Sequence, residues 1–194
     1  MNFLVDTSNR SSKKEIMDDL TMKGVLFKDT LDKLGIINRL LGGNKVTIKG
    51  LKELLKNQSN NKIITIVDLG CGHGDILRDV AKFGRENNYS FSLLGIDANI
   101  NAITYAKELS REYTELSFKA IDIFSEDFKK QSYDIVLCTL FLHHFKNNEL
   151  ISFLKTIVKK ATIGALSYTH LRAHETGRNR VCRVMGEKKK GGGG

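Results

Sequence analysis

A continuous run of β-branched residues, Ile63–Val67, leads into the glycine-rich segment Asp68-Leu69-Gly70-Cys71-Gly72-His73-Gly74. Such a run indicates a strand that is buried on both faces, as in parallel sheets covered by helices. Glycines at alternate positions let the backbone turn sharply and approach a ligand closely, because no Cβ atom stands in the way. The helix predicted from Gly74 to Glu86 then presents free N–H groups at its first turn. This unit restricts the chain to folds built on parallel strands.

Strands and helices alternate after this first unit. Further strands are predicted at Phe91–Ile96, Leu116–Ile121, Tyr133–Cys138 and Thr162–Leu166. Between them, Asn99 is a candidate helix cap, and apolar residues from Leu150 to Val158 mark another helix. Alternation of this kind predicts parallel pairing through right-handed crossovers. The predicted fold class is therefore α/β, a Rossmann-like doubly wound and mainly parallel sheet.

The residues before the first strand predict a helical extension. From Lys13 to Leu41, apolar residues recur at the spacing of one helix face, namely Phe27, Leu31, Leu34 and Leu41. A second amphipathic helix is predicted from Val46 to Lys56, followed by a polar linker. We therefore divide the chain into an extension (residues 1–60), a core (61–166) and a tail (167–194).

Cysteine content and hydropathy bear on where the protein works. Cys71, Cys138 and Cys182 match neither a disulfide framework nor a zinc pattern, so we predict no metal site. A reducing, cytoplasmic setting is the simplest interpretation. The N-terminus lacks the regions of a signal peptide, and no apolar run is long enough to span a bilayer.

The net charge of +9 is unevenly distributed. From Ser167 onward the chain has seven Lys or Arg residues and two Asp or Glu residues, whereas the part before it has 24 against 20. A basic tail is typical of nucleic-acid binding, but the nearly balanced body is not. We therefore expect no nucleic-acid partner for the body of the protein.

The glycine spacing separates two classes of ligand. A dinucleotide fingerprint has the pattern G-x-G-x-x-G, with the pyrophosphate at the helix start. Here the pattern is G-x-G-x-G, with Asp68 two residues before the first glycine. This segment resembles the first motif of class I methyltransferases that use S-adenosylmethionine (SAM). The resemblance implies that the loop wraps the methionine part of SAM and that Asp68 helps to hold its amino acid end.

Three further matches follow in the order that the family requires. Asp97 ends the second strand, 23 residues after Gly74, and a carboxylate there can accept both ribose hydroxyls. Asp122 follows the third strand and resembles the position that contacts adenine. The fourth strand, with a structural Asp134, resembles the family's fourth-strand motif. Over roughly residues 13–166, the resemblance implies SAM as cofactor and these binding residues: Asp68, Gly70, Cys71, Gly72, Gly74, Asp97, Ala98, Asp122, Ile123 and Thr139.

His143 and His144 are the candidate catalytic residues. They lie in a stretch that resembles one found in small-molecule methyltransferases of this class. A phenol or alcohol acceptor must lose its proton, and histidine is suited to that task near neutral pH. In the alternative interpretation, one histidine packs under the loop and the other lines the cofactor pocket.

The segment Leu34–Gly43 resembles a bacterial subgroup often encoded beside type III polyketide synthases. That resemblance implies a phenolic or quinol-like small-molecule acceptor. The resemblance to class I enzymes implies that the N-terminal helices form a lid over SAM and acceptor; in the alternative interpretation they are only a packing extension. Two other functions stay open at this point. One is a nicotinamide-dependent oxidoreductase; the other is a non-catalytic module that binds SAM or nucleic acid. No feature of the sequence indicates an oligomeric state.

The tail departs from the pattern of the core. Ser167–Thr176 has neither strand alternation nor an apolar helical face, and it resembles the in-frame translation of a transposase-type sequencing-library adapter. Val181-Cys182-Arg183 and the terminal lysines and glycines fit the far end of such an adapter. We therefore expect residues 167–194 to be non-native and disordered, and the methyltransferase fold to be truncated after about Leu166.

Resequencing the locus from independent DNA tests this expectation. The genomic reading frame should diverge from the printed sequence at about Leu166 and continue with further strands and helices. Finding the codons for Ser167–Thr176 intact in genomic DNA would refute the adapter interpretation.

Overall fold

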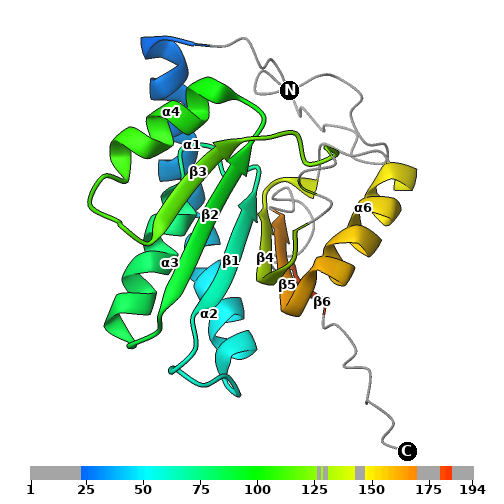
Figure 1. The fold of residues 1–194 in the computed structure, drawn as a ribbon. Coiled ribbons are helices and arrows are strands. Elements are labelled where there is room, and N and C mark those ends of the chain that lie inside the picture. Colours follow the sequence, from blue (N-terminus) through cyan, green and yellow to red (C-terminus); the bar gives the residue numbers. More distant parts are fainter. Residues whose placement is uncertain (1–22, 126–127, 129–130, 143–146, 170–179, 185–194) are drawn as a thin grey trace, which may run out of the picture.

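A computed structural model of the chain describes residues 23–125, 128, 131–142, 147–169 and 180–184. Helices and strands alternate along most of it (Figure 1). The helices are α1 (Val25–Leu40), α2 (Gly43–Leu55), α3 (Asp75–Glu86), α4 (Ile100–Leu109) and α6 (Asn147–Lys160). The strands are β1 (Ile64–Leu69), β2 (Phe91–Asp97), β3 (Leu116–Ala120), β4 (Tyr133–Thr139), β5 (Ala161–Thr169) and β6 (Arg180–Val184).

One sheet organises these elements, with the strand order β3-β2-β1-β4-β5-β6. Strands β1 to β5 pair in parallel, and β6 joins β5 antiparallel. The predicted Rossmann-like, mainly parallel sheet is thus confirmed. The order of strands reverses between β1 and β4, and open α/β sheets bind their ligands at such a switch point, beyond the carboxyl ends of the strands.

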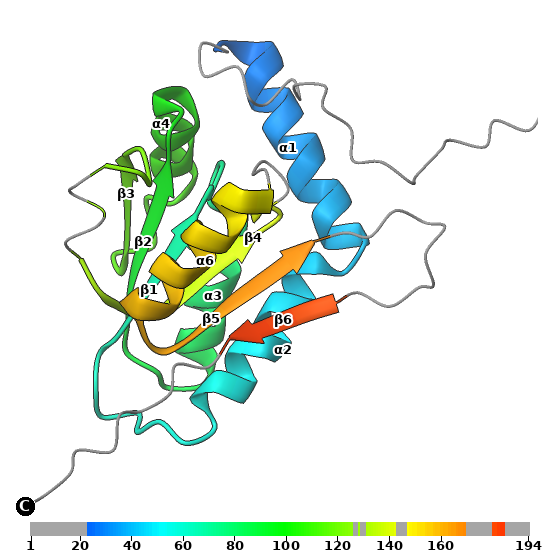
Figure 2. The same ribbon diagram turned by 90° about the vertical axis from the view of Figure 1, so that its right-hand side faces the viewer.

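Helices cover both faces of the sheet (Figure 2). On one face, α2, α3 and α4 pack on the sheet through a continuous apolar core that includes Leu51, Leu77 and Ile103. On the other face, Phe153 and Ile157 of α6 pack on β4 and β5. Since both faces are covered, β1 and β4 are buried almost throughout, as the β-branched run predicts. None of the described helices is long and apolar enough to cross a lipid bilayer.

Helix α1 differs from its prediction in the face that it buries. Phe27 and Leu31 are buried as expected and pack against Ala102 of α4. Leu34 and Leu41, however, are 45% and 56% exposed, and the buried stripe continues instead through Gly35 and Asn38. The reason lies in the partner surface of the second half of α1, where Gly35 lies against His73 of the loop and Asn38 donates to Asn44 of α2.

The tail also differs from its prediction. The fifth strand does not end at Leu166 but continues to Thr169, because Ser167 and Tyr168 extend the ladder beside Cys138 and Thr139 of β4. Residues 180–184, placed in the expected disordered tail 167–194, form β6 against this extension. Valines at two of the five β6 positions suit a strand.

A buried carboxylate ties the amino ends of three strands together. Asp134 of β4 accepts hydrogen bonds from the backbone N–H of Thr65 (2.9 Å) and from its hydroxyl (3.0 Å). The hydroxyl of Thr162 on β5 donates to the other oxygen at 2.7 Å. Burial would raise the pKa of Asp134, but these donors and the nearby Lys62 outweigh it and lower the pKa below its ordinary value. Asp134 is therefore structural and lies at the opposite end of the sheet from the glycine-rich loop.

Replacing Asp134 by Asn should lower the free energy of unfolding by about 1–3 kcal/mol, because an amide turns a donor toward groups that need an acceptor. A lowered pKa in the folded state means that the carboxylate's contribution is complete above the unfolded-state pKa, about 3.9, and is lost as the pH falls through the folded value. The difference between wild type and D134N should therefore shrink below about pH 4. Urea denaturation between pH 3 and 7 measures it, with the exposed Asp29→Asn as control. Equal stability at pH 7 would contradict the prediction.

Candidate functional site

The glycine-rich loop connects β1 to α3 and lies at the carboxyl edge of the sheet. Gly70, Gly72 and Gly74 have φ angles of 70°, 53° and 76°, in the left-handed region that glycine adopts without strain. The N–H groups of Gly70 and Cys71 donate to the carbonyl of Ile96 on β2 at 2.9 and 3.1 Å. The loop is therefore fastened to the neighbouring strand.

Asp97, predicted to contact ribose, also holds the loop in place. Its Oδ2 accepts the N–H of Gly72 at 2.9 Å, and its Oδ1 accepts the N–H of Asn99 at 2.9 Å. Asn99 in turn caps α4, as predicted, by accepting from Asn101 at 2.8 Å. Ala98 beside Asp97 is exposed at the same edge.

Asp68 is the most unusual side chain at this edge. It is 2% exposed, and within the described part of the chain its Oδ1 atom has no hydrogen-bond partner. Burial raises the pKa of Asp68 well above its ordinary value, and the charges of Asp75 and Asp97 raise it further. A buried carboxylate that lacks a partner is costly, so this atom complements a cationic hydrogen-bond donor.

Cys71 and His73 occupy the two positions between the glycines. Burial raises the pKa of the Cys71 thiol well above its ordinary value, which opposes a thiolate nucleophile or ligand. Burial also lowers the pKa of His73. Over the described residues, no group of three His, Cys, Asp or Glu side chains is arranged to hold a metal ion. The predicted role of Cys71, through its backbone, is compatible with this geometry.

The remaining predicted binding residues follow β3 and β4. Asp122 accepts the N–H of Phe124 at 2.9 Å and so shapes its own turn, while Ile123 is buried in the core. Thr139 ends β4 and is buried, with its hydroxyl 3.5 Å from that of Thr47 on α2. All of them lie at the edge that carries the glycine-rich loop, because the strands run parallel.

The turn after β4 brings an aromatic ring onto the loop. Leu140 has φ 55°, a left-handed conformation that is unfavourable for a leucine. The ring of Phe141 then lies so close to Gly70 that a Cβ at that position would collide with it. The loop is thus closed from this side. The candidate catalytic residues His143 and His144 come next in the chain and lie outside the described residues.

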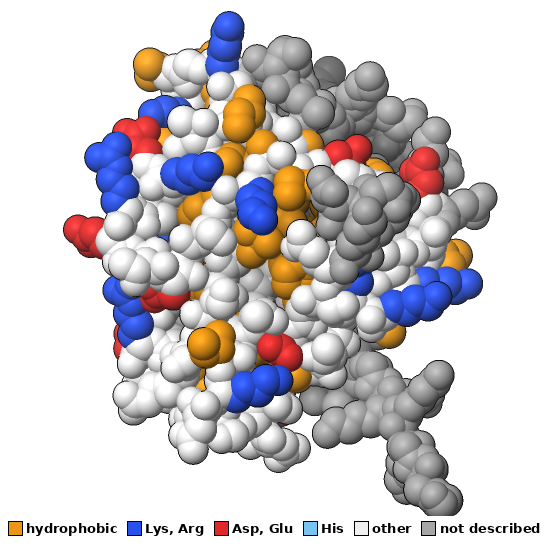
Figure 3. Space-filling model, in the orientation of Figure 1, with side chains coloured by type: hydrophobic (Ala, Val, Ile, Leu, Met, Phe, Trp, Pro, Cys, Tyr) orange, Lys and Arg blue, Asp and Glu red, His pale blue; other side chains and the backbone are white. Residues whose placement is uncertain are grey.

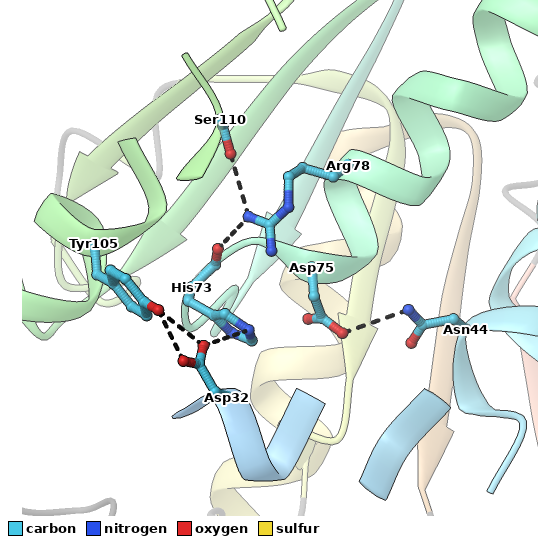
Figure 4. A network of polar contacts seen from close by, with 7 residues as sticks. All are labelled: Asp32, Asn44, His73, Asp75, Arg78, Tyr105 and Ser110. Carbon is cyan, nitrogen blue, oxygen red and sulfur yellow. Dashed lines mark hydrogen bonds and ion pairs between the residues drawn. The ribbon is translucent and has the colours of Figure 1, made fainter. Parts of the chain in front are cut away.

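Helices α1 and α4 add a polar network that the sequence analysis did not identify (Figure 4). Asp32 of α1 accepts the hydroxyl of Tyr105 at 2.8 Å, and its other oxygen lies 3.8 Å from Nε2 of His73. The rings of His73 and Tyr105 stack at 6.1 Å. Arg78 donates to the carbonyl of His73 at 2.6 Å. The conformation of the loop therefore depends on α1 as well as on the sheet.

Periodicity gave no signal for Asp32 and Tyr105, because polar residues at exposed helix positions are common. For Asn38, by contrast, the sequence spacing does carry a signal. It lies eleven residues after Phe27 and seven after Leu31, which places it on their face of the helix. A polar residue on an otherwise apolar face is a candidate for a specific interaction.

The fold and the loop define an α/β protein with a candidate ligand site at the carboxyl edge of its sheet. A family model described as a methyltransferase domain matches residues 60–182, which is more than half of the chain. The chain belongs to this methyltransferase domain family. The family agrees with the interpretation drawn from the motifs and not with the oxidoreductase alternative.

Individual relatives are more distant. A protein named "Putative methyltransferase 235L" from Invertebrate iridescent virus 6 is 37% identical over 73 residues, which cover 38% of this chain and 24% of the viral protein. The structure of the DszA carbon methyltransferase aligns with a TM-score of 0.61 at 20% identity, over 74% of this chain and 40% of that one. The magnesium protoporphyrin IX methyltransferase of Synechocystis PCC 6803, solved with bound SAM, aligns with a TM-score of 0.53 at 16% identity, covering 80% and 69%. These structures share the fold, and the chain spans less than half the length of the first two relatives.

Gly74 and Gly42 offer a matched test of the packing around the loop. Both precede a helix with left-handed angles, at φ 76° and φ 80°. A Cβ at Gly74 would lie 2.7 Å from the ring of Phe118, whereas one at Gly42 would meet nothing within 4 Å. Gly42→Ala should cost about 1 kcal/mol for its backbone alone. Gly74→Ala should cost about 1–3 kcal/mol more, because the ring must move. Urea denaturation of both variants measures the difference, and equal losses would show that Phe118 yields freely.

Proposed function

We propose that the chain binds SAM at the glycine-rich loop and transfers its methyl group to a small-molecule acceptor. The observation that carries this proposal is the buried, unpartnered Oδ1 of Asp68 beside the loop. SAM has a primary ammonium at its amino acid end, which supplies the cationic donor that this atom lacks. The family match and the order of the motifs support the same ligand.

The charge of the site favours SAM over a dinucleotide. The site contains three neighbouring carboxylates. The charges of Asp75 and Asp97 add to burial in raising the pKa of Asp68. The pyrophosphate of a dinucleotide would bring further negative charge to this group, whereas the sulfonium and ammonium of SAM outweigh its single carboxylate and leave it with a net positive charge. Repulsion between like charges therefore adds to the evidence of the glycine spacing against NAD.

Each predicted residue has a role in this proposal. Asp68 accepts the ammonium, and Gly70, Cys71, Gly72 and Gly74 provide backbone close to the methionine part. Asp97, which holds the N–H groups of Gly72 and Asn99 at the end of β2, accepts the ribose hydroxyls. The adenine and the rest of the ligand are proposed to lie against these residues: Ala98, Asp122, Ile123 and Thr139.

When bound, SAM would supply a methyl group that is activated by its sulfonium. The acceptor's electron pair would form the new bond to the methyl carbon, and the electron pair of the broken C–S bond would pass to sulfur. The protein contributes positioning, because in-line displacement needs the two reactants aligned. Helices α1 and α2 are proposed to cover the site as a lid and exclude water. A proton released by a hydroxyl acceptor passes to a base, for which His143 and His144 are the candidates. The acceptor proposed from the segment Leu34–Gly43 is phenolic or quinol-like.

The face shown in Figure 3 does not favour a nucleic-acid-binding function. On the face shown in Figure 3, basic and acidic side chains are interspersed, and hydrophobic side chains gather along its middle. A basic stripe would be expected for binding to a phosphate backbone. Buried free thiols at Cys71 and Cys138 fit the proposed reducing, cytoplasmic location.

Isothermal titration with SAM, with its product S-adenosylhomocysteine (SAH) and with NAD tests the proposal. SAM and SAH should bind and NAD should not; a preference for NAD would refute the assignment.

Asp68→Asn should weaken SAH binding about tenfold or more, since a charge-assisted hydrogen bond is lost. The pKa of Asp68 is raised in the folded state, so at any pH above its unfolded-state pKa the ionised carboxylate opposes folding. D68N lacks this charge and should therefore have a higher melting temperature than ligand-free wild type at pH 8. Its SAH affinity should also lack the rise with pH that ionisation of Asp68 gives wild type.

A further inference from the structure

Two asparagines are buried where α1 and α2 meet the start of α3. Asn38 is 4% exposed and Asn44 is 5% exposed. Asn44 belongs to the first turn of α2 and points toward Asp75 on α3 (Figure 4). Asn38 continues the buried stripe of α1, where an apolar side chain would ordinarily pack. A buried amide is retained at such a position when its polar atoms have partners.

The hydrogen bonds around Asn44 determine how Asn38 is oriented. Nδ2 of Asn44 donates to Oδ2 of Asp79 at 2.7 Å and lies 3.4 Å from Oδ2 of Asp75. An ionised carboxylate only accepts hydrogen bonds, so the amide of Asn44 must face these residues with its nitrogen. Its oxygen then accepts from Nδ2 of Asn38 at 2.6 Å. The oxygen of Asn38 is consequently the atom left over.

That oxygen is an orphan. Oδ1 of Asn38 is fully buried and has no hydrogen-bond partner among the described residues. The other buried side-chain atom in this condition is Oδ1 of Asp68. Both atoms are acceptors. The helix that carries Asn38 lies against the glycine-rich loop, since a Cβ at Gly35 would be 2.8 Å from Cε1 of His73 and 3.6 Å from Oδ2 of Asp75. Asn44, the partner of Asn38, also lies 3.4 Å from Oδ2 of Asp75. One buried group that donates several hydrogen bonds would complement both.

We infer that Asn38 is a binding residue for the methyl donor, with its Oδ1 accepting an N–H of the ammonium that Asp68 also accepts. The inference rests on the proposed function and extends it to the N-terminal helices. A primary ammonium has three N–H donors, enough for both oxygens. Helix α1 is then part of the binding site for the methyl donor and contacts the amino acid end of the ligand directly.

Two ligands distinguish this role from a structural one. SAH contains the ammonium, and its desamino analogue has hydrogen in that position. Isothermal titration should show that Asn38→Leu, which keeps the size and removes the acceptor, weakens SAH binding about tenfold. The affinity for the desamino analogue should be nearly unchanged. Asn87→Leu is the matched control: Asn87 is bound to the carbonyl of Phe83 at the far end of α3, so both affinities should stay as in wild type.

Each result has a distinct meaning. If N38L weakens both ligands equally, Asn38 only supports the fold, and if it weakens neither, its oxygen does not meet the ammonium; either result overturns the inference. If wild type binds neither SAM nor SAH, the proposed function itself fails. Asn38→Ala repeats the comparison if N38L does not fold, and thermal unfolding of the ligand-free variants shows whether they are intact.

Discussion

The hydrogen bond from the N–H of Gly72 to Oδ2 of Asp97 is the interaction on which the arrangement of the site depends. It fixes the middle of the glycine-rich loop to the end of β2, while the carbonyl of Ile96 fixes the loop's beginning. The same carboxylate starts α4 through Asn99. Its charge also contributes to the raised pKa of Asp68. One side chain therefore holds the loop in shape and adds to the negative charge around Asp68.

The two ends of the parallel sheet have separate tasks. At the amino ends, both oxygens of Asp134 accept hydrogen bonds, from Thr65 on β1 and from Thr162 on β5. At the carboxyl ends, Asp68, together with Asn38 of the neighbouring helix α1, keeps an acceptor that has no partner among the described residues. Unsatisfied buried groups weaken a fold, and they persist where binding needs them. The hydrogen-bonded carboxylate of Asp134 therefore offsets part of the instability that the two unsatisfied acceptors, on Asp68 and Asn38, introduce.

Local sequence signals predicted most of the core. The run Ile63–Val67, the alternate glycines and the cap at Asn99 each act within a few residues, so their structure follows from the sequence nearby. The parallel strand order follows from their alternation with helices. The face of α1 was mispredicted because Leu34 has the right spacing but no apolar partner, whereas Gly35 lets His73 approach at a distance that no Cβ would tolerate. The contacts of Asp32 with Tyr105 join residues 73 positions apart, and no local pattern reveals such a pair.

Phe118 on β3 connects two parts of the site that are distant in sequence. A Cβ at Gly74 in the loop or at Gly95 on β2 would come within 2.7 or 2.5 Å of its ring. The three positions are therefore sterically coupled. A side chain at either glycine requires the Phe118 ring to move or to become smaller, and one at Gly95 would also lie 2.8 Å from Sγ of Cys71. A smaller residue at position 118 would leave a cavity unless a glycine were replaced. Covariation among these three positions should mark the lineages in which the loop has been remodelled.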